Sequence, residues 1–178
     1  ETMGQSAEKM AKINAIPREA QDALAYRSHR NASAGTADGR LSAEIAPIWI
    51  PPGFDVAVSS DNGIREDTSL EALAALKPVF DRRYGSVTAG NASPLTDGAA
   101  AVLLMSEERA VSLGYTPLGF IRSYAYAALD PGEQLLMAPV LAAPVALQRA
   151  GLTLADMDLV DMHEAFAAQV LSNIQGLA

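Results

Sequence analysis

The residues best suited to do chemistry are His163 and Glu164. They directly follow an apolar run, Leu159 to Met162, that has the composition of a buried strand end, and an Ala-rich, helix-prone segment comes after them. Polar, titratable residues at a strand-to-helix junction are typical of ligand sites in α/β folds, which lie outside the carboxyl ends of the strands. His163 is one of only two histidines. Any contribution of this chain to a reaction is therefore expected here.

A histidine in this position can serve in three ways, and the pattern alone leaves them open. Its ring N–H can donate a hydrogen bond to a developing oxyanion. It can act as a general acid or base, because its pKa lies near neutrality. It can also be a histidine of the core with all its hydrogen bonds satisfied. A metal site is disfavoured, because no further histidine or cysteine lies near His163 and Glu164.

Two other segments could contact a ligand. The loop Gly90–Gly98 lacks the glycine spacing and the Lys-Ser/Thr ending of a phosphate loop. Its small residues would let a ligand approach the backbone, but an ordinary loop has the same composition. The second segment contains the main concentration of cations, which either cradles an anionic ligand or balances the neighbouring acidic residues. These cations are Arg65, Lys77, Arg82 and Arg83.

Composition limits the classes of function. The 178 residues are 49% hydrophobic and 19% charged, enough for a sizeable core, and the formal charge of −8 argues against a nucleic-acid partner. There is no cysteine, no apolar run of bilayer length and no signal-peptide pattern. A cytoplasmic location is expected, or a mitochondrial one if the source is eukaryotic. Because the chain starts at Glu1 and stops at Ala178 within a helical pattern, we expect a piece of a larger protein.

The order of elements predicts an α/β fold. Pro17 suits the first turn of the second helix, and the helical pattern weakens after residue 30. The other histidine, His29, lies near the end of this helix and is expected to be solvated. Pro47 confines the first strand to an edge or a bulge. Strands separated by helices are typical of layered α/β folds. Apolar spacing predicts helices over residues 2–14, 17–30, 69–76, 106–113 and 139–150, and strands over residues 44–50, 86–89, 99–105, 118–128 and 159–162.

Three segments together resemble the thiolase family. The first is Met3-Gly4 to Ala7-Glu8 with the following Arg18-Glu19-…-Gln21-Asp22 helix, the second is Ala89 to Ala101, and the third is His163-Glu164-Ala165-Phe166-Ala167. The resemblance covers essentially all 178 residues. It is closest to the 3-ketoacyl-CoA thiolases of fatty-acid β-oxidation complexes (the trifunctional type), which carry His where most thiolases carry Asn before Glu-Ala-Phe.

The resemblance implies a thiolase-like five-layer αβαβα fold, made of two similar halves with an inserted loop domain that covers the active site. On that pattern, residues 1–88 are most of the loop domain. Residues 89–114 end the N-terminal half, and residues 115–178 begin the C-terminal half.

The resemblance also implies an activity, the cleavage of a 3-ketoacyl-CoA by free coenzyme A to acetyl-CoA and a shortened acyl-CoA. In the family, one cysteine is acylated, a second moves the proton at the α carbon, and a histidine in a Gly-His-Pro motif activates the nucleophile. The nucleophile would precede Glu1, and the other two would follow Ala178. A thiolate must accept the acyl group, so this chain alone is expected to be inactive.

Some family roles fall on residues of this sequence. His163 matches an oxyanion-hole residue, and Arg65 matches a cation near the nucleotide end of CoA. Ser93 and Ala89 match the lining of the pantetheine arm. The apolar matches are Leu73 and Phe80, which contact CoA, and Met3 and Phe166, which line the acyl and catalytic pocket.

Two hypotheses follow. In the first, the chain is the central part of a 3-ketoacyl-CoA thiolase, with CoA and 3-ketoacyl-CoA as substrates and no metal. A homo-oligomer is expected, with a β-oxidation multienzyme subunit as a further possible partner, because apolar runs such as residues 99–105 and 159–162 need cover. In the alternative, the chain is a non-catalytic module that binds acyl-CoA or a partner subunit.

Overall fold

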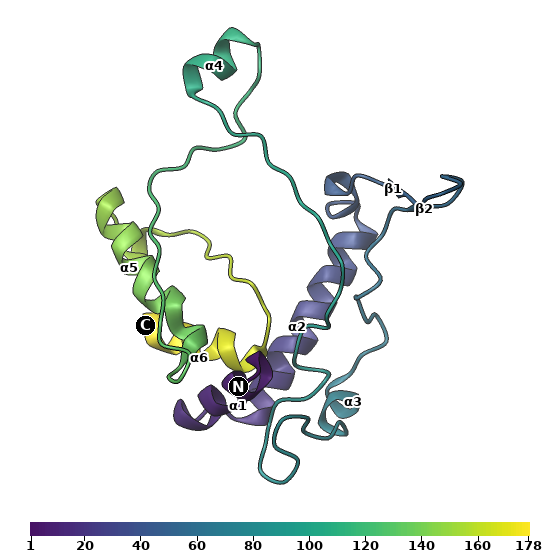
Figure 1. Ribbon diagram of the computed structural model, residues 1–178, viewed down its shortest axis with the longest axis vertical. Coiled ribbons are helices and arrows are strands. Elements are labelled where there is room, and N and C mark those ends of the chain that lie inside the picture. Colours follow the sequence, from purple (N-terminus) through teal and green to yellow (C-terminus); the bar gives the residue numbers. More distant parts are fainter.

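The computed structural model describes all residues, 1–178, and it is dominated by helices (Figure 1). Helices α1, α2 and α6 meet near the N-terminus, and α5 runs beside α6. Helix α4 lies at the end of a long excursion of the chain away from this group. The α-helices are α1 (Met3–Ile13), α2 (Arg18–Ala37), α3 (Leu70–Ala74), α4 (Glu107–Ser112), α5 (Ala138–Ala150) and α6 (Ala167–Leu177). Short 3₁₀ turns span η1 (Ser42–Glu44), η2 (Leu135–Met137) and η3 (Leu154–Asp156).

Local signals explain where the helices begin and end. Thr2 and Gln5 form a reciprocal capping box at the start of α1, and Ser69 and Ser106 cap α3 and α4 with their hydroxyls. Gly151 adopts a positive φ of 71° after α5, a conformation that glycine reaches without steric cost. The predicted helices are therefore confirmed, except that α2 continues to Ala37, beyond its predicted end at residue 30.

The core lies where α1, α2 and α6 meet. Only 21 of the 178 residues are buried, so the core is small, and many large apolar side chains remain exposed. One cluster joins α1 and α6 with the segment before the Gly90–Gly98 loop, and the other joins α2 with α6. The first consists of Ala7, Ala11, Val87 and Ala168, and the second of Leu24, Ala167 and Val170.

The prediction of strands was largely wrong for this chain. The one sheet is an antiparallel pair, β1 (Ile48–Trp49) and β2 (Ala57–Val58), which shortens the predicted strand 44–50 to two residues and adds one within the predicted loop 51–68. Residues 86–89, 99–105, 118–128 and 159–162 form no strand. A strand exists only when its backbone groups pair with a neighbour, and the last three of these segments make no backbone–backbone hydrogen bond within these 178 residues.

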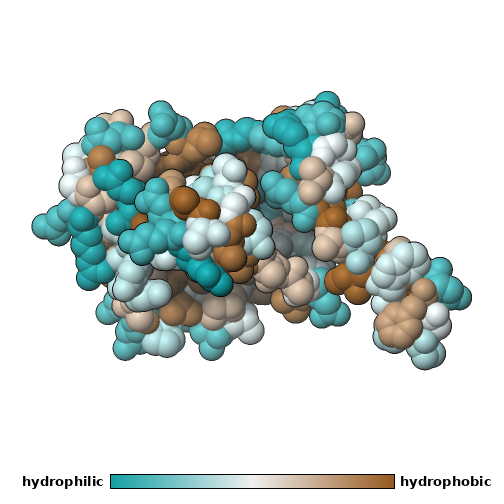
Figure 2. Space-filling view, turned by 90° about the horizontal axis from the view of Figure 1, so that it is seen from above, coloured by the Kyte–Doolittle hydropathy of each residue, from teal (hydrophilic) through white to brown (hydrophobic).

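The unpaired runs leave large apolar side chains open to solvent. Val102 is 83% exposed, Leu118 is 106% exposed and Leu159 is 89% exposed. Figure 2 shows apolar residues scattered between polar ones on the face seen from above. No helix has both the length and the apolar character needed to cross a membrane.

An ion pair on the surface makes stability depend on pH. The Asp81 carboxylate accepts hydrogen bonds from Lys12 Nζ at 2.5 Å and from the N–H groups of Tyr84 and Arg83 at 3.0 and 3.1 Å. The Lys12 bond first, and then the two backbone bonds, lower the pKa of Asp81 from 3.8 to about 2. The folded state thus favours the charged carboxylate. Ionised Asp81 therefore stabilises the folded protein at pH values above the pKa that this carboxyl has in the unfolded chain. This stabilisation is lost as the pH falls towards its pKa in the folded state.

We expect Asp81→Asn to be less stable than the unchanged protein at pH 7, with the difference shrinking between about pH 4 and about pH 2. Urea-unfolding midpoints of both proteins measured across this range test the expectation. A difference that stays constant with pH would contradict it.

Candidate active site

A short backbone bridge joins two of the segments singled out in the sequence. Ala92 and Phe166 form an isolated antiparallel bridge. The Ser93 N–H donates to the Ala165 carbonyl at 2.9 Å, and the Ala167 N–H donates to the Asn91 carbonyl at 2.9 Å. The start of the Gly90–Gly98 loop therefore lies beside the residues that directly follow His163 and Glu164.

Two phenylalanines connect this bridge to α1. The rings of Phe80 and Phe166 meet edge to face, with centroids 6.3 Å apart. The Phe80 ring occupies the space beside Gly4, where a Cβ atom would lie only 1.9 Å from Phe80 Cζ. Met3, which precedes Gly4, is half-exposed and lines a small cavity of about 250 Å³ with Ser6. The predicted site residues Phe80 and Phe166 thus contact each other, and Met3 is the chain neighbour of the glycine against which Phe80 packs.

The loop itself rests on α3. Leu73 is 3% exposed, and its Cδ2 would be 2.6 Å from a Cβ atom on Gly90. The absence of a side chain at Gly90 therefore allows the loop to approach α3 closely. Ala89 and Ser93 are exposed. In this structure Leu73 supports the loop from beneath, whereas Ala89 and Ser93 are free to meet a ligand.

Arg65 stands apart from this group. Its guanidinium makes no hydrogen bond, and its backbone N–H donates to His29 Nδ1 at 3.2 Å. The expectation that His29 is merely a solvated helix residue was wrong, because the ring is half-buried and accepts this bond. The contact joins α2 to the start of the segment that leads to α3.

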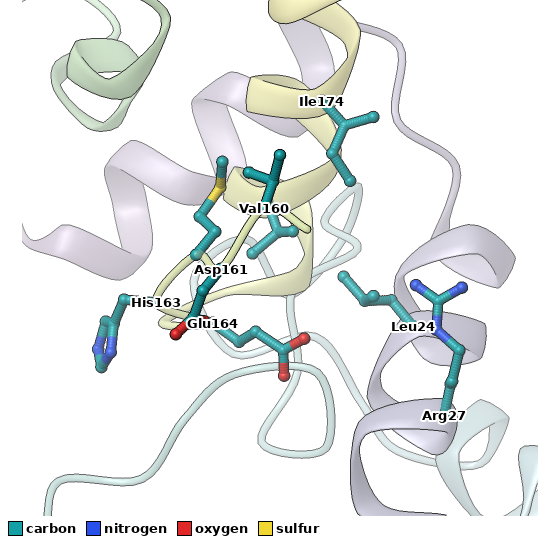
Figure 3. Close-up of a pocket in the computed structure, with 9 residues that line it drawn as sticks. Leu24, Arg27, Val160, Asp161, His163, Glu164 and Ile174 are labelled. Atoms are coloured by element: carbon teal, nitrogen blue, oxygen red, sulfur yellow. The ribbon is translucent and has the colours of Figure 1, made fainter. Parts of the chain in front are cut away.

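His163 and Glu164 line a cavity of about 530 Å³ between α2 and α6 (Figure 3). The Glu164 carboxylate points towards Leu24 and Arg27 and accepts a hydrogen bond from Ser28 Oγ at 2.5 Å. The His163 ring points away from them, is exposed and makes no hydrogen bond. The complete lining is Leu24, Arg27, Val160, Asp161, Met162, His163, Glu164, Val170 and Ile174.

This geometry indicates different roles for Glu164 and His163. The bond to Ser28 ties Glu164 to α2, which suits a residue that orients its neighbours. The unpaired ring of His163 has an N–H available for a ligand oxygen. No group of three or more His, Cys, Asp or Glu side chains is arranged to hold a metal ion.

Three buried polar side chains received no individual role in the sequence analysis. Glu8, Asp22 and Asn91 are each at most 4% exposed, and all three hold the turn that leads into the Gly90–Gly98 loop. Glu8 follows Gly4 by four residues and precedes Ala11 by three, so helical spacing places it on the buried face of α1. This spacing is the sequence signal from which the burial of Glu8 could have been predicted.

Profiles of known families match nearly the whole chain. The profile of the thiolase N-terminal domain matches residues 1–108, and that of the thiolase C-terminal domain matches residues 115–178. The chain belongs to the thiolase family. Residues of both thiolase domains thus contribute to the region around Phe166.

Named thiolases are close in sequence. The chain is 58% identical over 177 residues to a 3-ketoacyl-CoA thiolase of Aeromonas salmonicida (strain A449), covering 99% of this chain and 40% of that relative. It is 54% identical over 173 residues to a 3-ketoacyl-CoA thiolase of Escherichia coli O157:H7 (strain EC4115 / EHEC), covering 97% and 39%. The chain thus spans about 40% of the length of the curated relatives it matches.

A solved structure confirms the expected α/β, thiolase-like fold. The crystal structure of the Bacillus anthracis acetyl-CoA acetyltransferase matches with a TM-score of 0.92 and 41% identity, over 99% of this chain and 44% of that one. The match covers almost the whole chain, so residues 99–105, 118–128 and 159–162 follow the backbone of that structure although they lack the hydrogen-bonded neighbours of a sheet.

Proposed function

We propose that this chain is part of an acyltransferase that cleaves a 3-ketoacyl-CoA with free coenzyme A, releasing acetyl-CoA and a shortened acyl-CoA. Membership of the thiolase family supports the proposal. So do the names of the relatives, 3-ketoacyl-CoA thiolase in sequence and acetyl-CoA acetyltransferase in structure.

The bridge between Ala92 and Phe166 is the observation that carries the proposal. Through it the exposed hydroxyl of Ser93 and the exposed ring of His163 belong to two segments that are hydrogen-bonded to each other. A ligand with an extended, polar arm can therefore contact the loop while its reactive carbonyl lies near His163.

His163 has the role of a hydrogen-bond donor in this proposal. When a thiolate attacks a carbonyl carbon, negative charge develops on the carbonyl oxygen. A ring N–H of His163 would donate to that oxygen and stabilise the transition state more than the ground state. Glu164, held by Ser28, keeps the segment oriented towards α2.

The remaining residues form the CoA-binding surface. The unpaired guanidinium of Arg65 suits a phosphate group at the nucleotide end. Ser93 and Ala89 line the pantetheine arm, with Leu73 supporting the loop beneath them. Phe80 is an apolar contact for CoA, and Met3 and Phe166 line the acyl pocket beside it, since the Phe80 and Phe166 rings meet edge to face.

The experiment that tests the proposal is an assay of 3-ketoacyl-CoA thiolysis with the full-length protein and with this chain alone. We expect turnover by the full-length protein and none by the chain, because its 178 residues contain no cysteine to accept the acyl group. Full-length protein that binds CoA in calorimetry but shows no thiolysis would overturn the proposal in favour of a non-catalytic binding module.

We also propose that the protein is a homo-oligomer and that a β-oxidation subunit is a further partner. The exposed apolar runs around Val102, Leu118 and Leu159 support this, since surfaces of this kind are usually covered. Light scattering on the assay samples that finds only monodisperse monomers would contradict it.

A further inference from the structure

The turn that leads into the Gly90–Gly98 loop is held between two buried carboxylates. Glu8 of α1 accepts hydrogen bonds from the N–H groups of Ser86 and Val87 at 2.8 and 2.9 Å. It also accepts one from Ser86 Oγ at 3.2 Å. Asp22 of α2 binds the other end of the turn, at Asn91. The turn is thus tied to two helices that lie far from it in the sequence.

Asn91 uses the full hydrogen-bonding capacity of its side chain except for one lone pair. Its Nδ2 donates to Asp22 Oδ1 at 2.9 Å and to the Ser86 carbonyl at 3.1 Å. Its Oδ1 accepts from the Thr88 N–H at 2.8 Å. The side chain is 3% exposed, so water cannot readily replace these partners. The orientation of Asn91 is therefore closely determined.

The network continues from Asp22 to α3. The second carboxylate oxygen of Asp22 accepts from Arg18 Nε at 2.7 Å. Arg18 Nη2 donates to the carbonyl oxygens of Leu73 and Leu76 at 2.6 and 3.1 Å. The guanidinium thereby joins α2 to the end of α3, the helix on which Gly90 rests.

The backbone of Asn91 extends the network towards His163. Its carbonyl accepts from the Ala167 N–H, and two residues later the Ser93 N–H donates to the Ala165 carbonyl. One residue thus bonds through its side chain to α2 and through its backbone to the segment that follows His163. The side chains of Glu8, Asp22 and Asn91 are each at most 4% exposed, so they do not form part of the exposed surface around Ser93 and His163.

We propose that Asn91, held by Asp22 and Arg18, is the positioning residue that keeps Ser93 and His163 in register for the reaction. This inference rests on the proposed thiolase function. The three residues act through the backbone of the loop and do not touch the substrate. A displaced loop would shift the ligand carbonyl relative to His163, and misplacement by about 1 Å can lower a rate by about 100-fold.

The test compares Asn91→Asp in the full-length protein with a matched control, Asn31→Asp. Both variants turn an amide into a carboxylate, but the Asn31 side chain is exposed on α2 and makes no hydrogen bond. At position 91 the new carboxylate loses both donors and faces Asp22. We expect kcat to fall about 10- to 100-fold at pH 8, with the KM for CoA changing less, and the control to match the unchanged protein.

The pH profile separates positioning from a general loss of structure. Two adjacent carboxylates hold one proton between them at a raised pKa. Protonation restores a donor between positions 91 and 22. We therefore expect the kcat of Asn91→Asp, relative to the unchanged protein, to recover as pH falls from 8 to 6. An unaltered kcat or a relative activity that does not change with pH would overturn the inference.

Hydrogen exchange provides a readout that does not need the proposed activity. In Asn91→Asp, we expect faster exchange in peptides covering residues 89–93 and 165–170, with α5 unchanged. Equal acceleration in α5 would show a general structural role and overturn the inference.

If Asn91→Asp does not fold, Asp22→Asn is measured in the same way. If the unchanged protein shows no thiolysis, the proposed function fails while exchange still decides the positioning role.

Discussion

Replacing His163 with leucine in the full-length protein lowers kcat for thiolysis about 100- to 1,000-fold, because one oxyanion-hole donor contributes about that much. Leucine keeps much of the volume of the ring but has no N–H. The KM for CoA changes little, because Arg65, Ala89 and Ser93 remain. Steady-state kinetics with varied CoA and saturating 3-ketoacyl-CoA measures both constants.

The matched variant is His163→Asn. An amide N–H can donate the same hydrogen bond, so this variant retains most of the activity that His163→Leu loses. Equal losses in the two variants would show that the ring acts as an acid or base, since an amide cannot exchange a proton near neutral pH. A change in KM alone would show that His163 serves only in binding.

Replacing Gly4 with alanine destabilises the protein by about 1–3 kcal/mol, the usual cost of overpacking. The added Cβ would lie 1.9 Å from Phe80 Cζ, so the ring must leave its place. Its departure also removes the edge-to-face contact with Phe166. Urea unfolding followed by circular dichroism measures the loss of stability.

Gly119→Ala is the control, because nothing lies within 4 Å of a Cβ atom there. We expect it to unfold at the same urea concentration as the unchanged protein. Adding Phe80→Leu to Gly4→Ala relieves the clash with a smaller side chain and recovers part of the stability. If Gly4→Ala is as stable as the Gly119→Ala control, the contact between α1 and Phe80 is not what holds this region together.

The helices could be predicted because their signals are local. Thr2 and Gln5 form the capping box of α1, and Gly151 ends α5 with a positive φ. These interactions span at most one helical turn, so they can be found from adjacent residues. The extension of α2 to Ala37 was missed because its last residues are small and polar, with little apolar periodicity.

The strands could not be predicted in the same way. Residues 99–105 and 118–128 have strand composition and follow the backbone of the Bacillus anthracis acetyl-CoA acetyltransferase, yet they form no strand here. Composition reports how well a side chain suits a sheet, whereas a strand also requires a backbone partner, which can come from any distance in the sequence.

For the site, the sequence by itself determined that His163 and Glu164 stand between an apolar run and a helix, and the motifs around them indicated the family. Only the tertiary structure decided that Ala92 pairs with Phe166 and that the Asn91 side chain binds Asp22. The physical reason is that these hydrogen bonds join residues far apart in the chain. Folding alone brings their donors and acceptors within about 3 Å of each other.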